Sequence, residues 1–279
     1  MKLIALGDNC IDVYRNSDET HPGGNAVNVA VHAARSGMDA EYLGAFADDF
    51  YAELLQKALA ANGVRYDRCP VIPHSITKQC VYDVINGERT FVEVIAGESW
   101  AGPIKLKERE MEILREASVI VSSVNAKIPE QLRAVEELPA VFAYDFGEKE
   151  KYRSEEYYDL VFGKIDLAMF SCRSMSTNEY REFADSLHRR GAVHVLATMG
   201  TEGQMFSNGT EVVHGAVEEV VPRDTMGAGD SFLSAVIHSL WMNGWQKGKP
   251  MPEDALSEAL QEGKRISGEN CLAPGGFGS

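Results

Sequence analysis

At 279 residues, with 44% hydrophobic and 25% charged residues, the chain has the composition of a globular protein with room for one large α/β domain or two small ones. Its formal net charge of −15 argues against a nucleic-acid backbone or an anionic membrane as the main partner, so an anionic substrate would have to rely on local donors and a metal. No apolar stretch approaches the roughly 20 residues that span a bilayer.

The first residues and the cysteines indicate the cellular compartment in which the protein is expected. Met1 to Gly7 form a short apolar run that passes directly into polar residues without a cleavable signal pattern, so we expect a cytoplasmic protein. The five cysteines are widely spaced and form no C-x-x-C pair, which is typical of reduced thiols. The seven histidines show no metal-ligand spacing, and a structural zinc is therefore not expected.

A buried strand is expected at Leu3–Leu6, followed by the polar sequence Gly7-Asp8-Asn9 and then by Asp12. In an open parallel sheet, ligands bind beyond the carboxyl ends of the strands. Carboxylates at this edge can accept hydrogen bonds from the hydroxyl groups of a ligand. Asp12 is therefore the first substrate candidate, and the alternative is a turn aspartate at a strand end.

Paired glycines come next in the chain. Gly23 and Gly24 precede a run of small residues that closes at Gly37, a pattern that predicts a tight turn leading into a closely packed helix. Asn25 and Asn28 lie near the start of this helix, where their amide groups can reach a ligand.

The following elements are a strand at Tyr42–Phe46 and a helix at Phe50–Ala61, which Asp48 is expected to cap. Two β-rich runs then flank Asn86-Gly87, which predicts a hairpin between residues 79 and 94. Because the hairpin interrupts an alternation of strands and helices, we expect it to stand apart from the main sheet. Arg89 in the hairpin either points toward a substrate or is a solvated charge.

The middle of the chain alternates regularly. Strands are expected at Val119–Val124, Val141–Phe146, Leu167–Phe170 and Val193–Thr198, with helices at Ile128–Leu138, Glu155–Phe162 and Thr177–Arg190. This order predicts an α/β fold with a doubly wound, mainly parallel sheet and right-handed crossovers.

The sequence Asp224-Thr225-Met226-Gly227-Ala228-Gly229-Asp230 precedes an apolar run with helical spacing that ends at Asn243-Gly244. Little side chain covers the backbone N–H groups of Gly227, Ala228 and Gly229. Since the first turn of a helix has unpaired donors and the positive end of the dipole, this segment is a candidate anion hole. Asp230 beside it suits a general base, and the alternative is an aspartate that only caps the helix.

Two of these segments resemble the signatures of the PfkB (ribokinase-like) carbohydrate kinases, namely Gly-Gly-x-x-x-Asn at 23–28 and the heptapeptide at 224–230. The resemblance covers nearly the whole chain, and together with Gly-Asp-Asn-Cys-Ile-Asp at 7–12 it is strongest to bacterial fructoselysine (fructosamine) 6-kinases. It implies a ribokinase-like three-layer αβα fold in which residues 1–279 form a single kinase domain, with a small β-sheet lid from about 12–22 and 74–100 inserted in it.

The resemblance also implies roles for individual residues. Asp230 would accept the proton of the sugar hydroxyl, while the amides of Gly227, Ala228 and Gly229 would stabilise the transferring phosphoryl group. Substrate contacts would come from Asp12, Gly23, Gly24, Asn25, Asn28 and Arg89, and nucleotide contacts from Thr198, Gly200, Gly203, Asp224, Thr225 and Asn270. Asp145 would face the phosphates or their metal. Ser171 and Ser174 stand where family members commonly carry the Asn-x-x-Glu that organises Mg²⁺.

The reaction implied by the resemblance is transfer of the γ-phosphate of ATP to the C6 hydroxyl of a fructosamine such as fructoselysine. The implied cofactors are ATP and Mg²⁺, and the implied assembly is a homodimer formed through the lid, with no nucleic-acid or membrane partner. Other acceptors (ribose, fructose, a keto-deoxy sugar acid or a nucleoside), the metal ligands and a monovalent-cation requirement stay open.

Functions from other classes are less well supported by the sequence. A catalytically silent sugar or nucleotide sensor would have no need of Asp230 beside an anion hole. A dinucleotide-binding dehydrogenase would carry G-x-G-x-x-G after its first strand, and a P-loop kinase would carry G-x-x-x-x-G-K-[ST]; neither pattern is present.

Overall fold

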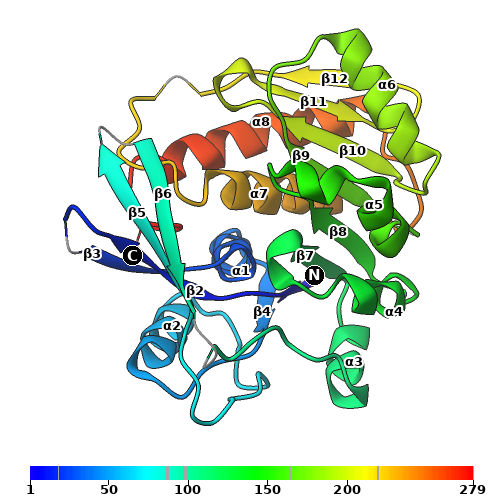
Figure 1. The fold of residues 1–279 in the computed structure, drawn as a ribbon. Coiled ribbons are helices and arrows are strands. Elements are labelled where there is room, and N and C mark those ends of the chain that lie inside the picture. The colour runs from blue at the N-terminus through cyan, green and yellow to red at the C-terminus, as the bar shows by residue number, and fades with distance from the viewer. Residues whose placement is uncertain (18, 86–87, 97–99, 164, 219, 279) are drawn as a thin grey trace.

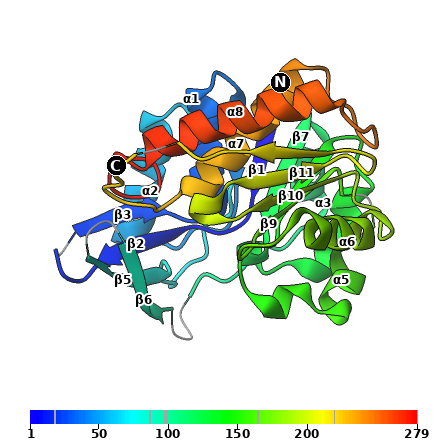
Figure 2. The ribbon, with the colours of Figure 1, turned by 90° about the horizontal axis from the view of Figure 1, so that it is seen from above.

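The structure is a computed structural model that describes residues 1–17, 19–85, 88–96, 100–163, 165–218 and 220–278. It contains a large and a small β-sheet, with helices on both faces of the large one (Figure 1, Figure 2). The large sheet is made of β1 (Lys2–Leu6), β4 (Asp39–Leu43), β7 (Val119–Ser123), β8 (Val141–Asp145), β9 (Leu167–Ser171), β10 (His194–Thr198), β11 (Gln204–Ser207) and β12 (Val212–Gly215). The small sheet is made of β2 (Cys10–Tyr14), β3 (Glu19–Gly23), β5 (Gln79–Ile85) and β6 (Glu88–Ile95). The helices are α1 (Asn25–Arg35), α2 (Phe50–Ala61), α3 (Glu108–Arg115), α4 (Leu132–Glu136), α5 (Glu155–Val161), α6 (Thr177–His188), α7 (Ala228–Met242) and α8 (Glu253–Asn270).

The strand order of the large sheet is β12-β11-β10-β9-β8-β7-β1-β4. Neighbouring strands from β10 to β4 are parallel, whereas β11 and β12 add an antiparallel pair at one edge. The carboxyl ends of the six parallel strands therefore lie along one edge of the sheet, where ligands bind in folds of this class.

Side-chain alternation along the strands builds two hydrophobic cores, one on each face of the sheet. In β1, Leu3 and Ala5 belong to one core, and Ile4 and Leu6 belong to the other; all four are fully buried. The first core is covered by α1, α2, α7 and α8, and the second by α3, α4, α5 and α6. The three-layer αβα architecture expected from the sequence is confirmed.

The small sheet has the order β3-β2-β5-β6, with β2 parallel to β5 and the other neighbours antiparallel. It lies beside α2, away from α5 and α6 (Figure 1, Figure 2). The expected hairpin is thus present and stands apart from the large sheet, as the sequence predicts. Whether this sheet closes as a lid stays a prediction.

Two adjacent aspartates fasten the segment that leads into β5. Asp49 caps α2 by accepting a hydrogen bond from the Ala52 N–H, and it also accepts from the Thr77 N–H and hydroxyl. Asp48 instead accepts from the N–H groups of His74 and Ser75. The expectation that Asp48 caps the helix was wrong: the capping carboxylate is that of Asp49, because Asp48 is directed to the loop before β5.

Several element bounds differ from expectation for local reasons. The strand expected at 42–46 is β4 (Asp39–Leu43), since its register on β1 ends at Leu43, and Phe46 pairs instead with Val71 in an isolated bridge. The helix expected at 128–138 begins with a 3-10 turn at Pro129–Gln131, so that α4 is confined to Leu132–Glu136. By contrast, α2 has the predicted bounds, and α7 ends beside Asn243 as predicted.

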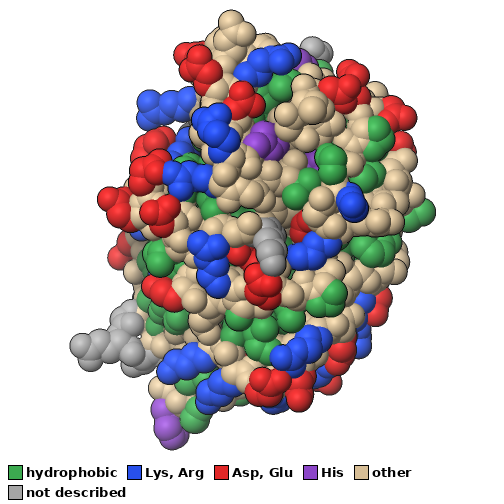
Figure 3. Space-filling model, turned by 90° about the vertical axis from the view of Figure 1, so that its right-hand side faces the viewer, with side chains coloured by type: hydrophobic (Ala, Val, Ile, Leu, Met, Phe, Trp, Pro, Cys, Tyr) green, Lys and Arg blue, Asp and Glu red, His purple; other side chains and the backbone are tan. Residues whose placement is uncertain are grey.

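The outer surface carries interspersed charges. On the face of the molecule at the right-hand side of Figure 1, acidic and basic side chains alternate with scattered hydrophobic ones (Figure 3). None of the helices in the described ranges combines the length and the apolar character that crossing a membrane requires.

Candidate active site

The N-terminus of α7 forms the turn predicted as an anion hole. Gly227 is the N-cap residue and has φ +70°, in the left-handed region that favours glycine. A Cβ at this position would clash with the carbonyl oxygen of Gly276, so the turn packs directly on backbone from the end of the chain. Residues 227–229 are partly or fully exposed, and a ligand can therefore reach them.

The amide groups of this turn are not all available. Within the described part of the chain, the N–H groups of Gly227 and Gly229 have no hydrogen-bond partner, as expected for an anion hole. The Ala228 N–H donates a long hydrogen bond of 3.3 Å to the Thr225 carbonyl, because the chain makes a tight turn before the helix. Three free N–H donors were predicted, and the structure has two, because the Ala228 N–H makes a weak hydrogen bond within the turn.

Asp230 lies in the first turn of α7 and is 8% exposed as a residue. Two amides from the facing helix α1 donate to it: Asn28 Nδ2 lies 2.7 Å from Oδ2, and Asn25 Nδ2 bonds Oδ1. The carboxylate is therefore buried among polar groups and not in apolar packing. The paired-glycine segment and the heptapeptide, about 200 residues apart in sequence, meet at this point.

Burial, together with the negative charges of Asp145 and Asp8, raises the pKa of Asp230 to about 7, and the hydrogen bonds from Asn28 and Asn25 only partly oppose this shift. A carboxylate with this pKa binds a proton far more readily than an ordinary aspartate does. A general base is most effective when its pKa lies near the working pH. The electrostatics of the site therefore suit Asp230 to proton transfer, whereas a simple helix cap would need no such shift.

Asp145, at the carboxyl end of β8, is joined to Asp230 through Asn25, whose Nδ2 lies 3.3 Å from Asp145 Oδ2. Burial also raises the pKa of Asp145, against the opposing hydrogen bond from the Gly147 N–H. Two carboxylates that share one amide donor repel each other, and a hard divalent cation with oxygen ligands would relieve that repulsion. The carboxylate oxygens of Asp145 are therefore suitable ligands for Mg²⁺. Ser171 and Ser174 contribute no further carboxylate.

Asp8 and Asn28 each present a buried oxygen without a partner. Asp8 Oδ2 accepts from Lys78 Nζ at 3.0 Å, but its Oδ1 has no hydrogen bond, and neither has Asn28 Oδ1, within the residues that the structure covers. Buried acceptors are rarely left unpaired unless a ligand or water satisfies them. Sequence reasoning gave Asp8 no firm role and missed Lys78, whose partner lies 70 residues away in the chain.

Asp224 is fully buried and joins three separate segments. Its carboxylate accepts from the Met226 N–H at 2.9 Å, from the Gly275 N–H at 2.8 Å, and from the Tyr14 hydroxyl in the small sheet. Asp224 was expected to contact a nucleotide. In the structure its oxygens hold the anion-hole turn to the C-terminal loop and to β2, and contact with a nucleotide stays a prediction. Tyr14 had no signal in the sequence for this contact.

Asn270 has a similar supporting position. It ends α8, is buried, and donates from Nδ2 to the Met226 carbonyl at 2.7 Å. Asn270 thus supports the turn at Met226, and its predicted contact with a nucleotide stays a prediction. Thr225 is half-buried, and its carbonyl accepts a hydrogen bond from the Ala228 N–H. Its predicted contact with a nucleotide stays a prediction.

Asp12 lies in β2 with its side chain buried. The carboxylate occupies the space where a Cβ of Gly23 would stand, so glycine is required there for β3 to pass close by. Gly24 is the N-cap residue of α1 and places Asn25 and Asn28 in the first turn facing α7. The predicted substrate residues therefore surround one end of α1, and contact of Asp12 with a sugar stays a prediction.

The predicted nucleotide turn follows β10. Thr198 ends the strand, and Gly200 and Gly203 bound a short 3-10 turn at the same edge of the sheet as Asp145. These positions are compatible with the predicted nucleotide contacts, which stay predictions. Arg89 belongs to β6 by its backbone, but its side chain lies outside the described residues.

Two hollows border the site. A cavity of about 180 Å³ opens between the small sheet and the C-terminal loop, with Tyr14, Glu19, Arg223, Asp224 and Pro274 in its walls. A narrower hollow lies at the carboxyl end of β1 and is lined by Asp8, Asn9, Trp100 and Asn125. The second hollow lies between the end of the large sheet and the segment that follows the hairpin.

Comparison with known proteins agrees with this geometry. Residues 1–275 match the family model described as pfkB family carbohydrate kinase. The chain is 29% identical to fructosamine kinase FrlD of Bacillus subtilis (strain 168), covering 100% of this chain and 93% of that protein. It is 28% identical to fructoselysine 6-kinase of Escherichia coli (strain K12), covering 91% of this chain and 93% of that protein.

Solved structures share the fold. A ribokinase of Arabidopsis thaliana complexed with ribose and ATP has a TM-score of 0.79 at 17% identity, covering 98% of this chain and 93% of its own. A fructokinase of Xylella fastidiosa with bound ATP has a TM-score of 0.78 at 17% identity, covering 99% and 94%. The ribokinase-like fold is thereby confirmed, and the match over residues 1–275 shows that the chain belongs to the pfkB family of carbohydrate kinases, which are phosphotransferases.

Proposed function

We propose that the chain transfers the γ-phosphate of ATP to the C6 hydroxyl of a fructosamine such as fructoselysine. The single observation that carries the kinase chemistry is Asp230, a buried carboxylate with its pKa raised to about 7, beside the unpaired amides of Gly227 and Gly229. The acceptor is inferred from the relatives named fructosamine kinase and fructoselysine 6-kinase, which align along nearly the whole chain.

The proposed chemistry is a direct displacement at phosphorus. Asp230 accepts the proton of the acceptor hydroxyl as its oxygen bonds to the γ-phosphorus and the bond to the β-phosphate oxygen breaks, which releases ADP. The amides of Gly227 and Gly229 stabilise the charge on the moving phosphoryl group, each worth about 3 kcal/mol by comparison with other oxyanion donors. The proton passes from Asp230 to solvent when the product leaves.

Binding of the acceptor is assigned to the end of α1 and β1. The unpaired oxygens of Asp8 and Asn28 are buried acceptors that sugar hydroxyls would satisfy, which favours a polyhydroxylated ligand. Asp12 adds a carboxylate in the same region. Closure of the small sheet over this region would exclude water that otherwise takes the phosphoryl group.

Mg²⁺ would be held by Asp145 together with phosphate oxygens and water, because Mg²⁺ keeps several waters and needs few protein carboxylates. When bound, the ion neutralises charge on the phosphates, as the chain's net charge of −15 demands. Thr198, Gly200, Gly203 and Thr225 are proposed to contact the nucleotide along the same edge of the sheet.

The test is a coupled ATPase screen of the purified chain with MgATP and fructoselysine, other fructosamines, fructose, ribose, a keto-deoxy sugar acid and nucleosides. We expect the highest kcat/KM for a fructosamine, and mass spectrometry with ³¹P NMR should locate the new phosphate at C6. The Asp230→Asn variant is the matched control: its turnover should fall by at least about 10²-fold while ATP and sugar binding persist. A higher kcat/KM for ribose or a nucleoside would replace the fructosamine, and full turnover by the variant would remove Asp230 from the mechanism.

A further inference from the structure

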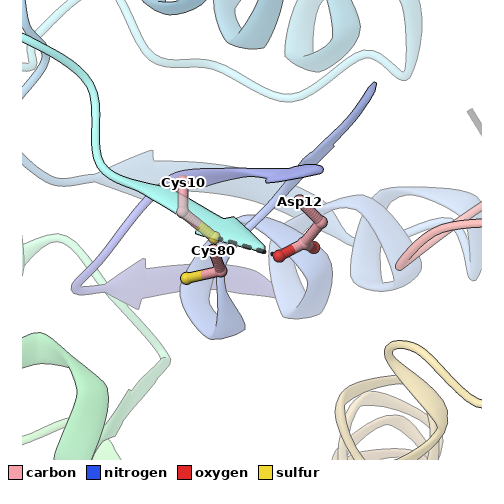
Figure 4. A group of neighbouring side chains, drawn as sticks. All are labelled: Cys10, Asp12 and Cys80. Atoms are coloured by element: carbon pink, nitrogen blue, oxygen red, sulfur yellow. Dashed lines mark hydrogen bonds between the residues drawn. The ribbon is translucent and has the colours of Figure 1, made fainter. Parts of the chain in front are cut away.

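Two cysteines and an aspartate from neighbouring strands of the small sheet lie together (Figure 4). Cys10 and Asp12 are alternate residues of β2 and share a face of the sheet, and Cys80 on β5 lies directly opposite Asp12. The two sulfurs and one carboxylate oxygen all lie within 4.8 Å of one another. This cluster has no sequence signature, because its ligands come from strands far apart in the chain.

The cluster is enclosed on two sides and open on one. Cys10 is 4% exposed and Asp12 is 2% exposed, whereas Cys80 is half-buried. Cys10 Sγ donates a hydrogen bond to Asp12 Oδ1 at 3.6 Å, drawn as the dashed line in Figure 4, and a second interaction joins the two thiols. Neither Cys10 nor Cys80 is in a disulfide, so both sulfurs can act as ligands.

Lys78 provides a positive charge beside the two thiols. The ammonium of Lys78 is itself held by Asp8 at 3.0 Å, so its position is fixed. With two thiolates and one carboxylate, the cluster would carry three negative charges, which a divalent cation and Lys78 together would balance.

We propose that Cys10, Asp12 and Cys80 form a binding site for a soft divalent cation of the Zn²⁺ or Cd²⁺ type. Two sulfur ligands and one carboxylate oxygen match the ligands that Zn²⁺ prefers, and a cluster within 4.8 Å needs only small shifts to surround one ion. Binding releases one proton from each thiol that is protonated, and a fourth coordination position is left for water. Mg²⁺ is excluded from this site by its preference for oxygen ligands.

The site would regulate the kinase, and this consequence rests on the proposed function. Asp12 is assigned there to the acceptor, so an ion that takes its carboxylate competes with the sugar. The same ion would tie β2 to β5 and fix the small sheet in one arrangement. We therefore expect Zn²⁺ to inhibit by raising the KM for the acceptor more than it lowers kcat.

The binding test uses Co²⁺ as a spectroscopic substitute for Zn²⁺ on the reduced full chain. We expect one ion per chain with a thiolate-to-cobalt charge-transfer absorption, displaced by Zn²⁺. Cys80→Ser should lose this absorption, while Cys172→Ser, which removes a half-buried thiol elsewhere, should keep it. Absence of the absorption in the unaltered chain, or its persistence in Cys80→Ser, would overturn the site.

A second measurement needs no variant and covers the case in which Cys80→Ser fails to fold. The unaltered chain is alkylated with iodoacetamide with and without Zn²⁺, and each cysteine is quantified by mass spectrometry. Zn²⁺ should protect Cys80 and leave Cys172 unprotected; equal labelling of Cys80 in both samples would contradict the proposal. Neither measurement depends on turnover. The metal site can therefore be disproved while the proposed kinase function stands, and the kinase function can be disproved while the metal site stands.

Discussion

Asp230 and its neighbours show how a few side chains prepare one carboxylate for chemistry. Asn25 and Asn28 donate to its two oxygens, while burial and, to a lesser extent, the charges of Asp145 and Asp8 raise its pKa. The position of Asp230 beside an anion-binding turn was predictable from the heptapeptide alone. Its partners were not, since α1 and α7 are distant in sequence, and only the resemblance to a known family linked the two motifs.

The pH dependence of catalysis follows from this environment. A general base works when deprotonated, so kcat/KM for the acceptor should rise with pH and level off above the Asp230 pKa of about 7. Asn28→Ala removes a hydrogen bond that favours the charged form, and it should move the rising limb to higher pH. The measurement is kcat/KM against pH for both proteins, with the coupling enzymes in excess at every pH. A rising limb centred near pH 4, where an ordinary aspartate titrates, would contradict the assignment.

The same carboxylate should make the folded chain less stable at high pH. The pKa of Asp230 is raised from 3.8 to about 7 on folding, so between these values the folded chain retains a proton that the unfolded chain has lost. The contribution of Asp230 to the stability of the folded chain therefore falls as the pH rises from 3.8 to about 7. Above this range the folded state carries the full cost of a buried charge.

Asp230→Asn should remove that cost. At pH about 8 we expect the variant to be more stable by on the order of 1–3 kcal/mol, with little difference near pH about 3, where the aspartate is mostly protonated in both states. Urea unfolding at the two pH values measures this difference. A variant that is less stable at both pH values would show that the carboxylate is needed for folding.

At the level of elements, local patterns were predictable where they are self-contained. Helix α2 has the bounds that its apolar spacing predicts, and β5 and β6 pair antiparallel as expected, whereas the predicted Asn-Gly turn lies outside the described residues. The edge strands β11 and β12 and the helices α3 and α8 were not predicted. The sequence does not distinguish Asp48 from Asp49 as the cap of α2, because it does not show that Asp48 accepts hydrogen bonds from His74 and Ser75.

The turn before α7 allows a matched pair of glycine substitutions. Gly227→Ala would force a left-handed residue with a Cβ against the Gly276 carbonyl, and we expect a loss of about 2 kcal/mol or more in the free energy of unfolding. Gly229→Ala is the control, because its Cβ would meet only Met169 Cε at 3.9 Å. It should leave stability unchanged or increase it by up to about 1 kcal/mol. Urea denaturation distinguishes the two, and equal losses would show that the strain at Gly227 does not matter.

At the scale of the whole molecule, the small sheet offers a surface for a second copy of the chain. Its edge strand β6 carries Phe91, which is 55% exposed, and Val94, which is 48% exposed. Large exposed apolar side chains on an edge strand favour association. We propose that the chain forms a homodimer through this sheet.

Light scattering during gel filtration measures the assembly directly. We expect a dimer for the unaltered chain and a monomer for Phe91→Glu. Phe50→Glu is the control, since Phe50 is 70% exposed on α2 and lies outside the small sheet. A monomer at micromolar concentration without substitution, or dissociation by both variants, would contradict the proposed interface.

The contacts of Asp224 have a consequence for how the protein is made. The Asp224 carboxylate accepts hydrogen bonds from Tyr14, Met226 and Gly275, so the turn before α7 is held by backbone that is synthesised some 50 residues later. While a ribosome is still translating that stretch, the nascent polypeptide has the proton acceptor but lacks the scaffold that holds the turn in place. The proposed phosphorylating ability should therefore emerge abruptly, once Gly275 has left the exit tunnel, and not grow in step with the lengthening chain.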